Sequence, residues 1–110
     1  MAWEHEREHF RIQYPARVRP ELLVGEGVHE VLDLSEGGIR LRPAGPLETD
    51  DEGRIVGTLR LRRGESVEVE GRMLRRDGAD LIVRVTRGIT FRVIMEEQRW
   101  LLERSYGLGW

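Results

Sequence analysis

Two groups of residues in this chain have the chemistry to bind an anionic ligand. The first is the pair Arg7 and Arg11, four positions apart, whose planar guanidinium groups match phosphate oxygens and guanine edges. The second is the segment 33–38, which holds the Asp33 carboxylate, the Ser35 hydroxyl and two adjacent glycines. Glycine accepts positive φ angles and carries no side chain. A ligand could therefore lie against bare backbone there while the carboxylate and the hydroxyl reach it from the side.

Both groups also have a purely structural explanation. Turns favour Asp, Ser and Gly, so Asp33 and Ser35 could simply cap the turn that contains Gly37 and Gly38. The two arginines alternate with glutamates and could belong to a solvated run of charges. Spacing alone does not decide between these explanations and a binding site.

Hydrophobic alternation predicts a strand on each side of the segment 33–38. Before the turn, one side of a period-2 pattern holds Val28, Glu30, Leu32 and Leu34. After the turn, Ile39 and Leu41 resume the pattern, with Arg40 and Arg42 on the opposite side. The sequence therefore predicts a strand–turn–strand hairpin that ends near Pro43.

The rest of the chain repeats this alternation. A first strand enters at Tyr14 and runs toward Leu23, with Pro20 marking an edge or a bend. A loop at 43–53, rich in Pro, Gly and acidic residues, follows the hairpin. Apolar residues then alternate in four further segments, at 55–61, 67–73, 81–86 and 89–95, which glycine-containing turns separate. Seven short strands at this spacing predict an all-β antiparallel barrel or sandwich.

A helix is predicted from Glu96 to about Tyr106, because this segment lacks Pro and Gly and is rich in good helix formers. Two glutamates open it at the positive end of the helix dipole, and Arg104 lies near the other end. Gly107 would stop the helix.

The composition excludes several classes of protein. A chain of 110 residues suits one domain with a single core, and the absence of cysteine excludes disulfide and thiolate chemistry. The net charge of −2 comes from 20 acidic and 18 basic residues, and all the bases are Arg. This balance argues against a bulk nucleic-acid binder. With no apolar run of roughly 20 residues and no signal-peptide core, we expect a cytoplasmic protein.

The segment 5–9 matches the zinc-protease pattern H-E-x-x-H, but we expect no protease site there; adventitious zinc or nickel binding by His5 and His9 fits the pattern better. Protease chemistry needs both histidines on one helix face, a third ligand and a substrate cleft. The pattern begins at residue 5 with no apolar helix face around it, and His29 is the only other histidine. Ser35 likewise lacks the strand–turn–helix elbow of hydrolases, so we expect no enzymatic activity.

An R-x-x-x-R pair that is followed, after the next strand, by D-x-S-x-x-G resembles the PilZ domain family. The matching residues are Arg7, Arg11, Asp33, Ser35 and Gly38. The segment 88–91 and the closing helix resemble the family's last strand and C-terminal helix, so the resemblance covers nearly the whole chain. It implies a six-stranded antiparallel β-barrel that binds the bacterial second messenger cyclic di-GMP.

With this resemblance, the chain divides into a flexible N-terminal arm at 1–13, a barrel at 14–95, and a C-terminal helix and tail at 96–110. The implied ligand-binding residues are Arg7, Arg11, Asp33, Ser35, Gly37 and Gly38, and no cofactor is implied. The arginines would bind phosphate oxygens or the O6 and N7 edge of guanine. Asp33 would accept from guanine N–H groups, Ser35 would bond phosphate or the guanine edge, and Gly38 would allow close approach.

Because the two arginines lie on the arm, we expect the ligand to order it against the barrel, a change that a partner protein could read. Glu6 precedes Arg7 where many members of the family have another basic residue, which argues against a second nucleotide stacked in the same site.

Two alternatives to a cyclic di-GMP receptor remain open. One is a PilZ-like protein-interaction module that binds no nucleotide. The other is a barrel that binds single-stranded nucleic acid, which would need aromatic platforms on a basic face; the chain has three Trp, two Tyr and two Phe.

Overall fold

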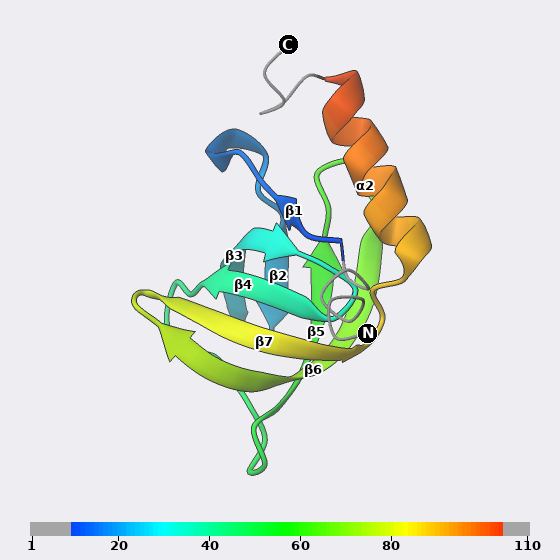
Figure 1. Ribbon diagram of the computed structural model, residues 1–110. Coiled ribbons are helices and arrows are strands. Elements are labelled where there is room, and N and C mark those ends of the chain that lie inside the picture. Colours follow the sequence, from blue (N-terminus) through cyan, green and yellow to red (C-terminus); the bar gives the residue numbers. More distant parts are fainter. Residues whose placement is uncertain (1–9, 105–110) are drawn as a thin grey trace, which may run out of the picture.

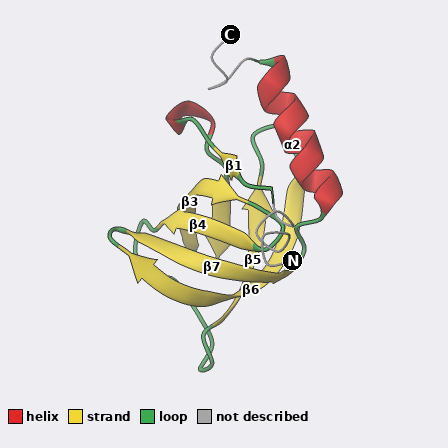
Figure 2. Ribbon diagram, viewed as in Figure 1, coloured by secondary structure: helices red, strands yellow, loops and turns green. Residues whose placement is uncertain are grey.

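The alternating apolar segments form the strands of a sheet in the computed structural model, which describes residues 10–104 (Figure 1). Strands make up most of the described elements, with one long helix beside them (Figure 2). In chain order the elements are β1 (Ile12–Gln13), the 3-10 helix η1 (Ala16–Val18), β2 (Glu21–Val24), β3 (Gly27–Leu34), β4 (Gly38–Arg42), β5 (Arg54–Arg60), β6 (Ser66–Asp77), β7 (Asp80–Arg87) and α2 (Phe91–Glu103).

Six strands close into an antiparallel barrel, and β1 is an extra strand. The hydrogen-bonded order is β1-β3-β2-β5-β6-β7-β4, and an additional pairing of β3 with β4 joins the two ends of the six-stranded part. On one edge, β3 pairs first with β2 and then, at its last two residues, with β1. Its other edge pairs with β4. The predicted all-β barrel of about six strands with a C-terminal helix is confirmed.

Side chains that alternate along the strands fill the interior. The most deeply buried of them, each at most 1% exposed, include Leu22, Val31, Leu34, Leu41, Leu59 and Val83. α2 adds Val93, Ile94 and Leu101 to the same cluster. Since full burial of one such side chain contributes about 1.5–3 kcal/mol, packing of this apolar face holds the helix on the barrel. In the described part of the chain, no helix is long and apolar enough to cross a membrane.

The predicted strand at 89–95 is wrong, because a helix begins inside it. α2 starts at Phe91, and the Thr90 hydroxyl caps it by accepting a hydrogen bond from the Val93 N–H at 3.3 Å. An extended segment would have placed Phe91 and Val93 on the same face. Instead Phe91 is 60% exposed, while Val93 and Ile94 are both buried, which is helical spacing. The helix predicted from Glu96 therefore begins at Phe91.

The predicted first strand is also wrong, because two prolines interrupt it. β1 covers just two residues, η1 follows Pro15, and β2 begins immediately after Pro20. Proline has no N–H to donate to a sheet ladder, so the chain leaves the sheet between these residues and returns at β2.

A β-bulge at Leu32 changes which side of β3 faces the core. Val31 pairs with Leu41, and Asp33 pairs with Arg40, so Leu32 is an extra residue between two consecutive pairs. The sequence pattern put Val28, Glu30, Leu32 and Leu34 on one side of the strand, but the first half of β3 buries His29 and Val31 in place of Val28 and Glu30. From the bulge onward, Leu32 and Leu34 of that side are buried. Without the bulge, the Asp33 side chain would have pointed into the core, on the same side of the strand as Val31.

A buried ionic cluster ties α2 to the segment after β1. The Glu97 carboxylate is 1% exposed and accepts hydrogen bonds from the Tyr14 hydroxyl and from Nε of Arg63, the latter at 2.6 Å. Arg63 also donates to Glu65 at 2.6 Å. Burial, together with the Glu97 charge, raises the pKa of Tyr14 well above its usual range. Tyr14 therefore remains a neutral donor that satisfies the buried carboxylate.

His29 is buried in its neutral form. It is 1% exposed, its Nδ1 accepts a hydrogen bond from the Ala44 N–H at 3.2 Å, and its Nε2 has no hydrogen-bond partner among the described residues. Burial lowers the pKa of His29, although the nearby Glu48 carboxylate acts in the opposite direction. Protonation of His29 at Nδ1 would place a second N–H opposite the Ala44 N–H. The folded state therefore disfavours the protonated form of His29.

We expect the free energy of unfolding to decrease as the pH falls below about 6.5, because the unfolded chain then binds a proton that folded His29 resists. The decrease from this group should level off below the folded-state pKa. Chemical denaturation at about pH 7.5 and about pH 5.5 measures the change. A His29→Asn variant keeps an acceptor near the Nδ1 position but does not titrate. The same pH dependence in that variant would contradict this assignment.

Candidate functional site

A hollow of about 580 Å³ lies beside the turn between β3 and β4 and extends over β7 to β6. It is lined by five of the residues predicted from sequence, namely Arg11, Asp33, Ser35, Gly37 and Gly38. Arg7, the sixth, lies outside the described residues. The structure thus brings together every predicted site residue that it describes. A volume of this size is within the range of about 300–1,000 Å³ that is usual for small-molecule sites.

Arg11 reaches the hollow because β1 pairs with the end of β3. Gln13 pairs with Asp33, and Ile12 with Leu34, so the residue before β1 comes level with the β3–β4 turn. The Arg11 side chain is 65% exposed, and its Nη1 lies 3.9 Å from Oδ2 of Asp33. This separation exceeds a hydrogen bond, so the guanidinium is near the carboxylate but not bound tightly to it.

The turn is closed by its own backbone. The Ser35 N–H donates to the Gly38 carbonyl at 2.9 Å, and the Val85 N–H donates to the Gly37 carbonyl at 3.0 Å, which joins the turn to β7. The Ser35 hydroxyl also donates to the Gly38 carbonyl, at 3.4 Å. The turn-capping explanation thus holds for Ser35, whereas Asp33 faces Arg11 and Arg40.

Gly38 is a glycine that the fold itself does not require. Positive φ angles occur elsewhere and not at Gly37 or Gly38, so the turn does not need glycine for its backbone conformation. A Cβ on Gly38 would lie 3.6 Å from the Val83 carbonyl oxygen and 3.7 Å from Oγ of Ser35, which is ordinary contact. The missing side chain leaves the backbone open toward the hollow.

Arg40 belongs to the site, although the motifs did not identify it. Its Nη1 donates to Asp80 at 2.8 Å and its Nη2 to Asp77 at 2.5 Å, while its Nε lies 3.8 Å from Asp33. Arg42 adds a 3.0 Å hydrogen bond to Asp80. These hydrogen bonds, first from Arg42 and then from Arg40, lower the pKa of Asp80. Asp33 therefore lies between two guanidiniums, and the turn is linked to the β6–β7 hairpin.

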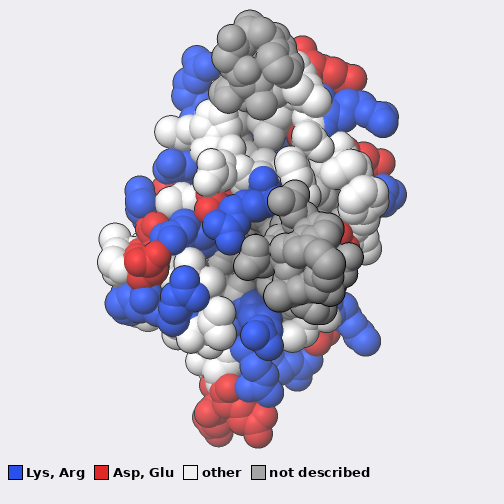
Figure 3. Space-filling view, in the orientation of Figure 1, with Lys and Arg blue, Asp and Glu red and all other residues white. Residues whose placement is uncertain are grey.

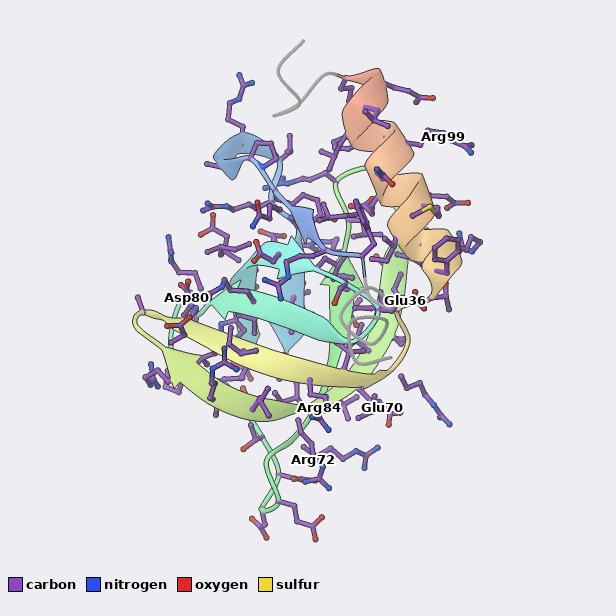
Figure 4. All side chains as sticks on the ribbon, viewed as in Figure 1. Glu36, Glu70, Arg72, Asp80, Arg84 and Arg99 are labelled. Atoms are coloured by element: carbon purple, nitrogen blue, oxygen red, sulfur yellow. The ribbon has the colours of Figure 1, made fainter. Side chains whose placement is uncertain are left out.

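Arg75 on β6 and Arg84 on β7 line the far side of the hollow. Basic side chains gather on this face of the molecule, over β4, β7 and β6, with a few acidic groups among them (Figure 3). Figure 4 labels Arg84, which lies in the middle of β7, and Asp80, the first residue of that strand. The sequence motifs identified neither of these two arginines as a neighbour of the turn.

The described residues contain no group of three or more His, Cys, Asp or Glu side chains that could hold a metal ion. His5 and His9 of the H-E-x-x-H pattern lie outside these residues. The expected binding groups are therefore guanidiniums, one carboxylate, one hydroxyl and backbone.

Comparisons with known proteins agree on the fold. The family model of the PilZ domain matches residues 5–107. A crystal structure of the PilZ domain of CeSA from a cellulose-synthesizing bacterium superposes with a TM-score of 0.51, covers 88% of this chain and 99% of that chain, and is 17% identical in sequence. At this identity the likeness concerns the fold. No curated protein matches the chain in sequence.

A comparison of two glycines tests whether the bare backbone at the turn is a packing requirement. Gly38→Ala should leave the free energy of unfolding within about 0.5 kcal/mol of the parent, because the new methyl meets no close neighbour. Gly71→Ala should be clearly destabilising, since its Cβ would lie 2.4 Å from the Arg84 carbonyl oxygen. Urea denaturation of both variants measures this difference. Equal destabilisation would mean that Gly38 serves packing.

Proposed function

The chain belongs to the PilZ domain family, which is known for cyclic di-GMP binding and signalling, and we propose that it binds cyclic di-GMP in the hollow beside the β3–β4 turn. The observation that carries this proposal is the convergence on one hollow of Arg11, from the segment before β1, with Asp33, Ser35 and Gly38, from the segment 33–38. These residues supply a cation for phosphate, an acceptor for a base, a hydroxyl and bare backbone.

The geometry supports a role for Asp33 as the guanine acceptor. Its distances to Arg11 and Arg40, 3.9 Å and 3.8 Å, are both too long for hydrogen bonds. Toward residues 10–104, the carboxylate therefore keeps its lone pairs available for the N–H groups of a guanine. The two nearby guanidiniums offset its repulsion of ligand phosphates.

Arg11 is suited to a phosphate or to the O6 and N7 edge of guanine. It is exposed, and its fork can hold two acceptors at once. Gly37 and Gly38 would let the ligand approach the backbone, and the Ser35 hydroxyl can still accept a hydrogen bond while it donates to Gly38. Arg7 completes the proposed ligand set from outside the described residues.

The proposed signal starts at the arm. β1 connects Arg11 to Tyr14, whose N–H donates to the Leu32 carbonyl at 2.9 Å and whose hydroxyl donates to Glu97 of α2. A ligand that orders the N-terminal arm would therefore act next to contacts that hold α2. We propose that a protein partner reads this arrangement.

Calorimetry with cyclic di-GMP, cyclic di-AMP, GTP and an oligonucleotide tests the proposal. We expect cyclic di-GMP to bind with a Kd of about 1 μM or below, equivalent to about −8 kcal/mol. Asp33→Ala should weaken the binding of cyclic di-GMP, because it removes the guanine acceptor. The difference in affinity between cyclic di-GMP and cyclic di-AMP should therefore become smaller. Arg11→Lys should weaken the binding of both nucleotides by about tenfold or more, because the ammonium point charge of Lys replaces the forked guanidinium of Arg.

Matched variants control this experiment. Glu36→Ala removes a neighbouring carboxylate that does not line the hollow, and Arg99→Lys changes an arginine on α2, away from the turn (Figure 4). Gly38→Ala should weaken binding, whereas Gly45→Ala, in an open loop position, should not. If no nucleotide binds to a correctly folded parent, the protein-interaction module without nucleotide binding becomes the better reading.

Amide hydrogen exchange tests the proposed switch separately from affinity. Saturating cyclic di-GMP should slow exchange within residues 1–13, because Arg7 and Arg11 would be held by the ligand. Exchange in the core strand β5 should not change, which provides the internal reference. Unchanged exchange in residues 1–13 under saturating ligand would exclude the switch while leaving the binding proposal intact.

A further inference from the structure

The hollow reaches beyond the residues of the sequence motifs, and its far side carries two arginines. Arg84 on β7 and Arg75 on β6 both line it. We propose that these two arginines contact the second half of the ligand, so that cyclic di-GMP lies across β4 and β7 rather than against the β3–β4 turn alone. This inference rests on the proposed function and assigns two specific contacts within it.

The register of the sheet puts the turn and both arginines on one outer face. Gly38 pairs with Arg84, and Arg75 pairs with Ile82. Paired residues point to the same side of an antiparallel sheet. β7 buries its odd-numbered side chains from 81 to 85, so Ile82 and Arg84 face outward together with their partners. Since Gly38 has no side chain, nothing on β4 at that position stands between the turn and Arg84.

The arginines of the hollow differ in whether carboxylates already neutralise them. Arg40 donates hydrogen bonds to Asp77 and Asp80 and lies near Asp33, so carboxylates of the protein itself already neutralise its charge. Within residues 10–104, neither Arg75 nor Arg84 has a hydrogen bond or an ion pair through its side chain. Two guanidiniums without carboxylate partners are therefore available to a phosphate or to a guanine edge.

The spacing and the surface between these arginines suit one nucleotide unit. Arg84 and Arg75 are diagonal neighbours across β7 and β6, for which Cα atoms are about 7–8 Å apart. Ile82 lies beside them, and Leu74, the bulged residue of β6, is 50% exposed in the same hollow. An apolar surface flanked by two cations can hold the face of a purine base while its phosphate or O6 edge meets a guanidinium.

Cyclic di-GMP has two guanines and two phosphates, and the motif residues account for one guanine and the phosphate beside it. Asp33 is the one carboxylate that the described residues offer as a base acceptor in the hollow. The second guanine would therefore be recognised through its O6 and N7 acceptors by an arginine, without a carboxylate. This arrangement predicts that Arg84 and Arg75 contribute affinity, while Asp33 contributes selectivity for guanine.

Calorimetry with cyclic di-GMP on four variants tests the assignment. Arg84→Ala and Arg75→Ala should each raise Kd by about tenfold or more, the effect of losing one bidentate contact. Arg87→Ala, on β7, and Arg76→Ala, on β6, remove the same charge from the same strands outside the hollow. These two controls should change Kd by no more than about twofold, because exposed charges act weakly at physiological salt. All four positions are exposed, and thermal melting confirms that each variant is folded.

The outcomes separate this inference from the proposed function. Tight binding by the parent, with Arg84→Ala and Arg75→Ala no weaker than the two controls, would overturn the assignment and leave the site at the turn intact. Equal losses in all four variants would show general charge attraction and would also overturn it. If Arg11→Lys and Asp33→Ala weaken binding while the parent binds tightly, the proposed function stands whatever the two arginines do. A parent that binds no cyclic di-GMP would overturn both.

Discussion

Backbone pairing of β3 with three other strands is the interaction on which the rest of this structure depends. Its pairing with β4 closes the barrel, its pairing with β2 holds the next strand of the sheet, and its last two residues hold β1. The bulge at Leu32 sits in the middle of these contacts. It changes the inward side of β3 so that Leu34 fills the core and Asp33 lines the hollow. The site therefore depends on one extra residue in one strand.

The charges around the site are arranged by the strands and not by the sequence order. All the bases of the chain are Arg, and several of the described ones form ion pairs with a carboxylate on another strand. Arg40 illustrates the effect, because it gathers Asp77 and Asp80 from the β6–β7 hairpin and approaches Asp33 from the side. Exposed pairs of this kind add little stability individually. Their importance here is that they decide which cations remain available to an anionic ligand.

Glu97 of α2 links the helix to the segment that carries Arg11, because it accepts a hydrogen bond from Tyr14. Glu97 is buried, and it would be costly without its donors Tyr14 and Arg63. Tyr14 follows β1 directly, so the same short segment presents one residue to the hollow and another to α2. This arrangement gives the proposed arm switch a physical route, since a change at β1 alters the surroundings of a buried ionic cluster.

The sequence by itself determined the barrel, because period-2 apolar patterns and glycine turns act locally. It also identified the turn at 33–38 and Arg11, whose spacing relative to the strands is a local property. Tertiary structure alone decided the bulge at Leu32, the helical start at Phe91 and the positions of Arg40, Arg75 and Arg84 around the hollow. Each of these depends on which residues of distant strands meet: a bulge is defined by its partner strand, and β4, β6 and β7 contribute arginines that are far apart in the chain. At Phe91 the apolar residues fit both periods, and packing of Val93 and Ile94 on the barrel selected the helix.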